Sequence, residues 1–348
     1  MDAPASDETR DVREEFYGRL GTRNLAPLWE VLKGLVPPEP KSKAQPFLWP
    51  YADIRPLLME SGGVVTAEEA ERRVLVLENP ALAGQSKATG TLYAGVQMIL
   101  PGETAPAHRH TQSALRFMIE GEGGFTSVAG ERTTMRKGDF VITPNWAYHD
   151  HGNEGSEPVV WLDGLDIPIV AFFEAGFGEG YNDKRHAITR PEGDSLARFG
   201  SGLLPANPVD RYGQASPIFN YPYDRTREAL VAAAAGEAPD AHIATTLRYA
   251  NPVNGSWAMS TMATWITHLA PGFETAAMRS TDGMVLAVSE GSGSIEVEGQ
   301  IFQFSENDVI AVPAWCWRSI KAQSECVLFG FSDRAAQEKL DLFREERA

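Results

Sequence analysis

The sequence is poor in cysteine and has no long apolar run. Its 348 residues include two cysteines, Cys316 and Cys326, which form neither a CxxC pair nor a zinc knuckle. Such rarity fits a reducing cytoplasm, the location we expect. No apolar stretch reaches the ~18 residues of a membrane-spanning helix, so no membrane partner is expected. The charged residues 1–23 lack the apolar segment of a secretory signal.

Basic residues are also scarce relative to acidic ones. The chain holds 31 Lys and Arg against 47 Asp and Glu, which gives a formal net charge of −16. A nucleic-acid partner is therefore not expected, because phosphates are neutralised by clustered basic residues. An anionic small molecule would have to be attracted by local arginines against the overall negative field.

Short apolar runs separated by Gly, Pro and Asn dominate two parts of the chain, a pattern typical of an antiparallel sandwich or barrel. The sequence therefore predicts an all-β protein with two barrel domains, a helical arm and a helical tail. Helical periodicity covers residues 7–34 and 335–348. The expected division is an arm with linker, a first β-domain, a connector, and a second β-domain with its terminal helix, at residues 1–90, 91–172, 173–240 and 241–348.

The two β-rich parts repeat one another. Three short motifs recur about 170 positions later: Pro101-Gly102 as Pro271-Gly272, Glu120-Gly121-Glu122-Gly123 as Glu290-Gly291-Ser292-Gly293, and Pro144-Asn145-Trp146 as Pro313-Ala314-Trp315. Such self-similarity indicates a duplicated domain, and we expect each copy to close its own core.

A histidine cluster lies in the first copy only. His108 and His110 are two residues apart, so on a strand they point to one face, and His149 can join them from another strand. The corresponding positions of the second copy hold Met278, Ser280 and Arg318. Because that set cannot hold a divalent metal, the sequence predicts one metal ion per chain and a structural second domain.

These residues resemble the cupin superfamily. The first cupin motif is matched by Pro101-Gly102, His108, His110 and Gly121, and the second by Gly138, Pro144, His149 and Asn153. Ala114 stands where most cupins have a glutamate ligand. The strings at 93–97, 107–117, 149–153 and 161–164 more closely resemble the gentisate 1,2-dioxygenases and their salicylate and 1-hydroxy-2-naphthoate relatives. The resemblance implies two cupin barrels, the second without metal, and a homotetramer.

Three neutral imidazoles leave the opposite face of a six-coordinate ion open, as in non-haem Fe(II) oxygenases. An aromatic 2-hydroxy acid can chelate there and leave room for O2. The resemblance implies an Fe(II)-dependent, extradiol-type ring-cleaving dioxygenase that converts gentisate to maleylpyruvate. Salicylate and 1-hydroxy-2-naphthoate are the alternative substrates.

A cupin isomerase or Mn-dependent decarboxylase is disfavoured by Ala114, and a non-catalytic ligand-binding bicupin is the alternative outside enzymes. Zinc could also occupy three histidines.

Arg116 and His151 are the expected catalytic side chains. Arg116 lies six residues after His110, so on one regular strand it would share that face and clamp a carboxylate bidentately. His151 shares a face with His149 and could be a fourth ligand, but the cupin spacing favours a hydrogen bond to substrate and a proton shuttle.

The family resemblance assigns further pocket residues. Gln97 would contact substrate oxygens, and Asp163 would orient Arg116 or His151. Arg72 or Arg73 could reach the pocket, and Trp146 with Tyr148 could line an aromatic slot. Each of these side chains could instead pack in the core or lie on a solvent-exposed face of a sheet. The remaining histidines have no partner spacing and are expected to be structural or surface residues: His186, His242 and His268.

Overall fold

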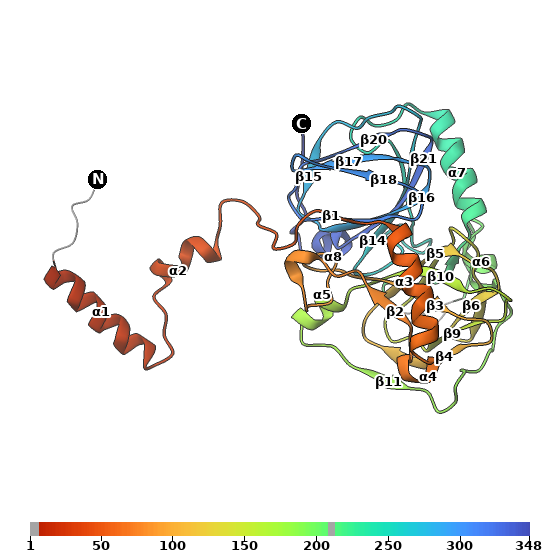
Figure 1. Cartoon of the computed structure of the whole chain (residues 1–348), viewed down its shortest axis with the longest axis horizontal. Coiled ribbons are helices and arrows are strands. Elements are labelled where there is room, and N and C mark those ends of the chain that lie inside the picture. Colours follow the sequence, from red (N-terminus) through yellow and green to blue (C-terminus); the bar gives the residue numbers. More distant parts are fainter. Residues whose placement is uncertain (1–6, 208–212) are drawn as a thin grey trace. The chain divides into compact units, whose positions relative to one another are not determined.

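The structure is a computed structural model that describes residues 7–207 and 213–348 (Figure 1). Residues 1–6 of the expected arm and 208–212 of the expected connector lie outside the described part. The chain forms two compact units, Met1–Lys41 and Ser42–Ala348. Among the described residues, no helix combines the length and apolar character needed to cross a bilayer.

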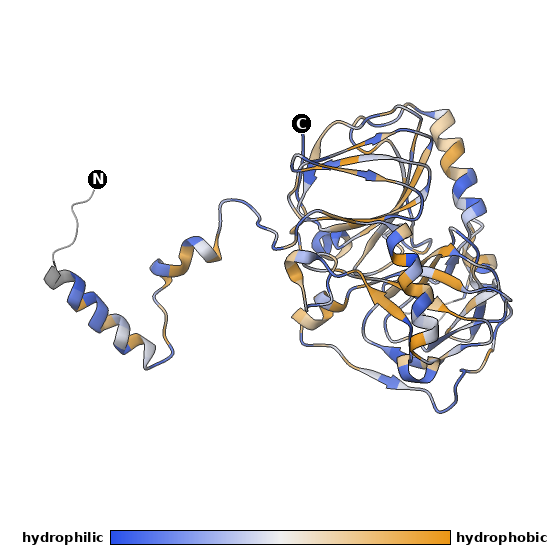
Figure 2. Cartoon of the chain, in the orientation of Figure 1, coloured by the Kyte–Doolittle hydropathy of each residue, from blue (hydrophilic) through white to orange (hydrophobic). Residues whose placement is uncertain are grey.

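The small unit contains two helices where the periodicity predicted one. Helix α1 (Asp7–Gly21) and helix α2 (Leu28–Leu35) are separated by a turn, and Pro27 precedes α2 because proline cannot continue a helix. The Tyr17 hydroxyl donates to Glu30 at 2.5 Å and accepts from the Trp29 indole at 2.8 Å. Figure 2 shows apolar residues on α2, and every residue of this helix is exposed to solvent.

The large unit contains two barrels, each built from a six-stranded and a five-stranded antiparallel sheet. The first barrel has the strand orders β12-β8-β5-β10-β3-β2 and β11-β4-β9-β6-β7. Its strands are β2 (Val74–Val76), β3 (Tyr93–Ile99), β4 (Thr104–His110), β5 (Ala114–Glu120), β6 (Gly124–Val128), β7 (Glu131–Thr134), β8 (Phe140–Thr143), β9 (His149–Asn153), β10 (Val159–Leu165), β11 (Gly178–Gly180) and β12 (Asn220–Tyr221).

The second barrel repeats this plan, with the strand orders β1-β19-β16-β21-β14-β13 and β18-β17-β20-β15-β22. Its strands are β1 (Phe47–Trp49), β13 (Thr245–Arg248), β14 (Ala263–Leu269), β15 (Met278–Ser280), β16 (Met284–Glu290), β17 (Gly293–Val297), β18 (Gln300–Phe304), β19 (Val309–Val312), β20 (Arg318–Ala322), β21 (Cys326–Ser332) and β22 (Glu345–Arg347). The helices of the large unit are α3 (Tyr51–Val64), α4 (Ala67–Ala70), α5 (Ile167–Phe172), α6 (Asp194–Phe199), α7 (Tyr223–Gly236) and α8 (Arg334–Lys339), with a 3-10 turn at Pro80–Leu82.

The two six-stranded sheets pack against one another through a shared apolar core. Phe117 of β5 stacks on Phe329 of β21, with ring centroids 4.4 Å apart. A side chain at Gly164 would place its Cβ 2.8 Å from the Phe331 ring, so only glycine allows this close approach. The expectation that each copy closes its own core therefore holds only in part: one apolar cluster lies within the second barrel and a smaller one within the first, but the largest cluster contains residues of both barrels.

Each barrel also receives a strand from the segment that precedes the other barrel. Strand β1 precedes the first barrel but pairs with β19 of the second, and β12 precedes the second barrel but pairs with β8 of the first. The helices that follow are tied in the same crossed way. The Tyr51 amide of α3 donates to Asp308 at 2.8 Å, and the Tyr223 amide of α7 donates to Asp139 at 2.8 Å. Residues 42–90, which the sequence grouped with the arm, thus lie in the large unit.

The expected terminal helix is shorter than residues 335–348. Helix α8 ends at Lys339, and Asp341 adopts a left-handed backbone with φ of 57°. The chain then forms β22, which pairs with the edge strand β15. Because an edge strand leaves unpaired backbone groups, this pairing offers the last residues more hydrogen bonds than a solvated helix would. The Arg279–Glu346 ion pair at 2.7 Å adds to the contact.

The shared core predicts that the two barrels unfold together. Phe329 is fully buried, and Phe329→Ala should lower the free energy of unfolding by about 3–5 kcal/mol, because the cavity left behind lies between both sheets. The matched control is Phe172→Ala, whose side chain is 81% exposed and should cost less than about 0.5 kcal/mol. Urea unfolding followed by circular dichroism measures both. Two separate transitions in the unmodified large unit would contradict a shared core.

Candidate metal centre

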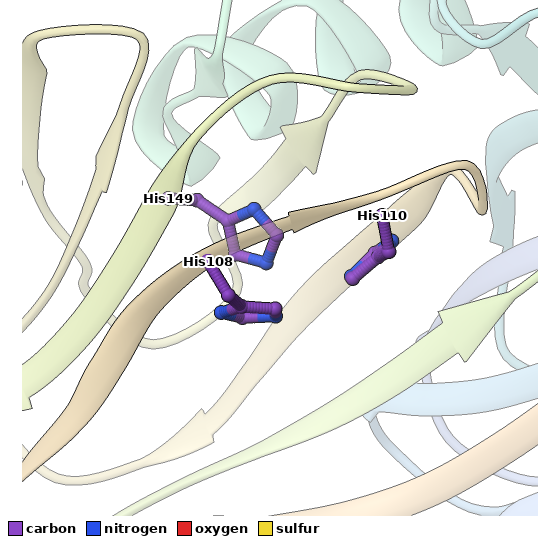
Figure 3. A group of neighbouring side chains, drawn as sticks. All are labelled: His108, His110 and His149. Carbon is purple, nitrogen blue, oxygen red and sulfur yellow. The ribbon is translucent and has the colours of Figure 1, made fainter. Parts of the chain in front are cut away.

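Three histidines converge inside the first barrel, from two adjacent strands of its five-stranded sheet (Figure 3). His108 and His110 lie on β4, and His149 begins β9, directly opposite His108 in the strand register. Their candidate ligand atoms all lie within 4.8 Å of one another. The i, i+2 spacing therefore does place two imidazoles on one face, as the sequence predicted.

The ring orientation of all three histidines is fixed by the backbone. Each Nδ1 lies within hydrogen-bond distance of a carbonyl oxygen two residues away, so Nδ1 carries the proton and the Nε2 lone pair points away from the backbone; that of His108 also faces the Arg72 guanidinium. The three contacts are His108 to Pro106 at 3.1 Å, His110 to Gln112 at 2.8 Å and His149 to Ala147 at 2.9 Å. The donor set present thus fits a divalent transition metal.

Burial keeps these imidazoles neutral. It lowers the pKa of His108 to about 3, with the nearby Arg72 guanidinium as a second cause, and it lowers the pKa of His110 to about 4. The pKa of His149 is lowered well below its ordinary value for the same reason. Neutral rings are the form that a metal ion requires, so the site is prepared for binding at neutral pH.

His151 lies behind this group and is held in a different network. Its side chain is 1% exposed, its Nδ1 lies 2.8 Å from the Thr126 hydroxyl, and its Nε2 lies 2.8 Å from Arg116 Nη2. Thr126 donates its proton to the carbonyl of Asp150, so it accepts from His151 Nδ1. The Nε2 of His151 therefore accepts from Arg116, and His151 contacts the arginine rather than the wall of the cavity.

A cavity of about 360 Å³ opens beside the histidines. Its polar lining includes four residues that the sequence singled out, Arg72, Gln97, Arg116 and Asp163. Ala114 also lines it, at the position where a glutamate ligand is absent. Gln97, Arg116 and Asp163 lie on β3, β5 and β10 of the six-stranded sheet, whereas the histidines lie on the five-stranded sheet.

Arg116 reaches the cavity for a reason other than the one predicted. Strand β4 ends at His110 and β5 begins at Ala114, so counting six residues along one strand does not apply. Arg116 instead projects from the facing six-stranded sheet. Its strand alternates strictly: Leu115 and Phe117 enter the shared core, whereas Ala114 and Arg116 face the barrel interior.

Arg116 and Asp163 form a buried pair of opposite charges. Arg116 Nε lies 3.7 Å from Asp163 Oδ1, and Arg116 Nη1 donates to Thr143 at 2.7 Å. Burial lowers the pKa of Arg116 to about 10 and raises the pKa of Asp163 to about 6, while each partner opposes the shift of the other. The Trp161 indole donates to the same Asp163 oxygen at 2.9 Å. The carboxylate thus lies beside the guanidinium and balances its charge, although Arg116 Nε forms no hydrogen bond among the described residues.

Gln97 supplies an unused hydrogen-bond donor. Its side chain is buried, and its Nε2 has no partner among the residues that the structure describes. An orphaned buried donor costs about 1–3 kcal/mol, a cost that a ligand oxygen can relieve. Arg72 lies closer to the histidines, with Nη2 2.6 Å from both ring nitrogens of His108. Arg73 turns away instead and pairs with Glu103.

Trp146 does not line the cavity. It adopts a left-handed backbone with φ of 62°, its ring centroid lies 4.5 Å from that of Phe177, and the Arg109 guanidinium covers it at 4.4 Å. Tyr148 lies on the other side of the same guanidinium, at 4.5 Å. The expected aromatic slot is thus a packing cluster around Arg109. Apart from the histidines, the aromatic residue that lines the cavity is Tyr93.

The other histidines behave as the lack of partner spacing predicted. His186 is buried, with Nδ1 2.8 Å from Asp150, and its Nε2 accepts from the Gly130 amide at 3.0 Å. This contact fastens the connector to β9. In the second barrel, Met278 and Arg318 face each other in the register as His108 and His149 do, and no second metal-ligand group appears within residues 7–207 and 213–348.

Two barrels that share this topology, with three imidazoles inside one of them, define a bicupin with one candidate metal site among the described residues. Residues 95–165 match the cupin domain family. The chain is 50% identical over 96% of both chains to gentisate 1,2-dioxygenase 1 of Aquipseudomonas alcaligenes, and 36% identical to a Streptomyces gentisate 1,2-dioxygenase over 99% of this chain and 98% of that one. The crystal structure of a salicylate 1,2-dioxygenase from Pseudoaminobacter salicylatoxidans with gentisate has a TM-score of 0.91 at 34% identity, covering 100% and 96% of the chains.

The protein belongs to the family of gentisate 1,2-dioxygenases and is a ring-cleaving oxidoreductase of that type. The family resemblance, the two-cupin fold and the enzyme class expected from the sequence are therefore confirmed.

The ligand assignment predicts opposite behaviour for two neighbouring histidines. His149→Ala should remove bound metal, because two imidazoles remain, whereas His151→Ala should retain it, because its Nε2 is engaged by Arg116. Metal content per chain is measured by atomic emission after dialysis. Met278→Ala in the second barrel is the control and should leave the metal content unchanged. Loss of metal from His151→Ala with retention in His149→Ala would reverse the assignment.

Proposed function

We propose that this protein is an Fe(II)-dependent dioxygenase that cleaves gentisate, 2,5-dihydroxybenzoate, to maleylpyruvate. Both atoms of O2 enter the product, and the ring opens between the carboxyl-bearing carbon and the adjacent hydroxyl-bearing carbon. The observation that carries this proposal is the neutral three-histidine group in a cavity that also presents Arg116 and Gln97. Fe(II), when bound by His108, His110 and His149, would supply the redox chemistry that lets a chelated hydroxy acid react with O2.

Arg116 is the residue that we assign to the substrate carboxylate. Its guanidinium is buried, so a carboxylate beside it would interact in a medium of low dielectric constant. Thr143 and Asp163 hold two sides of its fork, and its Nη2 donates to His151. We assign to His151 a positioning role through this bond, with Thr126 fixing its tautomer. Gln97 Nε2 would donate to a second substrate oxygen.

The ring pocket is bounded by Tyr93 and Val74, and both pack so closely on Gly95 that a side chain there would not fit. A Cβ at Gly95 would lie 2.6 Å from Val74 Cγ1 and 2.9 Å from the Tyr93 hydroxyl. Tyr93 and Val74 line the cavity, so the substrate ring would lie against them. Gentisate is our first choice because the relative at 50% identity is a gentisate dioxygenase. Salicylate is the second candidate, supported by the similar crystal structure, and 1-hydroxy-2-naphthoate is the third.

The arm suggests how copies of the chain assemble. Helix α2 leaves Leu28, Trp29 and Leu32 between 46% and 65% exposed, an apolar surface that a partner subunit would cover. We propose a homotetramer joined in part by these arms. The two free cysteines fit work in a reducing cytoplasm.

Oxygen consumption tests the proposed reaction directly. Protein loaded anaerobically with Fe(II) should consume one O2 per gentisate on mixing with air, and more slowly with salicylate, whose ring lacks the second electron-donating hydroxyl. The same preparation loaded with Zn²⁺ should consume none, because zinc has no redox chemistry. An oxygen electrode with product absorbance measures both. A preparation shown to hold iron that consumes no O2 with any of the three hydroxy acids would refute the proposal.

The carboxylate clamp predicts a strong effect at Arg116. Arg116→Gln should lower kcat/KM for gentisate by about 30-fold or more, because removing one partner of a buried charged hydrogen bond costs about 2–5 kcal/mol. Metal content should not change, since Arg116 is not a ligand. Arg132→Gln, a partly exposed arginine of the same barrel, is the control and should retain activity. Equal kcat/KM in the two variants would contradict the clamp.

A further inference from the structure

The second barrel contains a cavity of its own, about 720 Å³, twice the volume beside the metal centre. A cavity of this size is in the range that holds a drug-sized ligand. Most of its wall is apolar, contributed by Met278, Met284, Leu286, Ile320 and Leu328. It occupies the part of the second barrel that the metal site occupies in the first, because Met278 and Arg318 pair across β15 and β20 as His108 and His149 pair across β4 and β9.

A guanidinium stands in this apolar cavity where the first barrel has a metal ligand. Arg318 lines the cavity, and its Nη1 donates to the Ser280 hydroxyl at 3.2 Å. Within the described residues it forms no ion pair, and burial lowers its pKa. The second barrel has therefore exchanged a set of metal ligands for a fixed positive charge with donor capacity to spare.

A carboxylate with an unused oxygen lies in the same cavity. Asp282 is 3% exposed, lines the cavity, and its Oδ1 has no hydrogen-bond partner among the described residues. An unsatisfied buried carboxylate oxygen is costly, and it can be satisfied by a ligand that donates a hydrogen bond. The cavity thus presents the Arg318 guanidinium and an unsatisfied carboxylate oxygen among mostly apolar side chains, with Arg248 and Arg334 as its other arginines.

The catalytic residues of the first barrel have no counterpart here. By alignment of the paired strands, Arg116 corresponds to Leu286 and His151 corresponds to Ile320, both in the apolar wall. Gly330 takes the place of Asp163, and a Cβ there would lie 2.3 Å from the Trp265 ring. The second cavity therefore has the means to bind a ligand but not the groups to repeat the reaction.

We propose that the second barrel is a binding site for a hydroxy-substituted aromatic carboxylic acid. Its carboxylate would contact Arg318 and Ser280, its ring would pack on the methionines and leucines, and its hydroxyl would donate to Asp282. A dianion is disfavoured, because Asp282 already places a negative charge in the cavity. This site is independent of the metal, and the proposal does not rest on the reaction assigned to the first barrel.

The test uses the full-length, metal-loaded protein without O2, so that no turnover occurs, and 1-hydroxy-2-naphthoate as the probe. Hydrogen–deuterium exchange should show that the probe protects residues 278–286 and 318–322, at concentrations that saturate the second barrel. Arg318→Leu should raise the probe concentration at half-maximal protection at least 30-fold, with metal content and turnover of the first barrel unchanged. Arg248→Leu, an exposed arginine at the rim of the same cavity, should change the midpoint less than about 3-fold.

Two further probes separate the two polar contacts. 2-Naphthoate lacks the hydroxyl and should bind about 10-fold more weakly to the unmodified protein, and 2-naphthol lacks the carboxylate and should bind about 30-fold more weakly. Protection confined to the first barrel, or protection of Arg318→Leu with an unchanged midpoint, would overturn the proposal. Equal binding of 2-naphthol and the hydroxy acid would do the same. The exchange measurement on the unmodified protein decides the question even if Arg318→Leu does not fold.

Discussion

The contact between the two six-stranded sheets determines how the metal centre is built. Because β3, β5 and β10 are covered on their outer face by the second barrel, every second residue of these strands must be apolar, and Leu115, Phe117 and Leu162 meet that demand. The alternate residues face the barrel interior. Polar groups can enter this interior only where they find partners, which restricts them to a few positions and places Gln97, Arg116 and Asp163 opposite the histidines.

The electrostatics of the site follow from the same burial. Burial lowers the pKa of Arg116 only to about 10, because Asp163 opposes the shift, so the guanidinium keeps its charge at neutral pH, and the same burial keeps the histidines of the facing sheet neutral. The result is a division of labour between sheets: the five-stranded sheet presents uncharged metal ligands, and the six-stranded sheet presents a fixed cation. With a divalent metal ion on the histidines, a chelating anion placed between the sheets would meet positive charge on both sides.

Local periodicity was enough to predict the barrels, the three histidines and the inactive second copy, since each depends on residues close in sequence or on an aligned repeat. It was not enough where partners come from far away. The indole of Trp146 was expected in the pocket, yet its position follows from Phe177 and Arg109, which no spacing connects. The terminal helix was predicted too long, because the chain from Glu345 pairs with the edge of β15 and a local sequence pattern does not reveal this pairing. His151 was placed near the substrate, but its bond to Arg116 depends on a contact between two sheets.

The crossed placement of β1 and β12 has a consequence for how the two copies depend on each other. Each barrel is completed by a strand that is encoded in front of the other, and Asp308 and Asp139 anchor the helices that follow those strands. No single cut of the chain yields two complete barrels, because any cut between them leaves at least one edge without its partner. Because the barrels exchange strands in this way, the structure of the first barrel depends on the second even though the second has no metal-ligand group among its described residues. The interior of the second barrel can therefore hold side chains of a different chemistry.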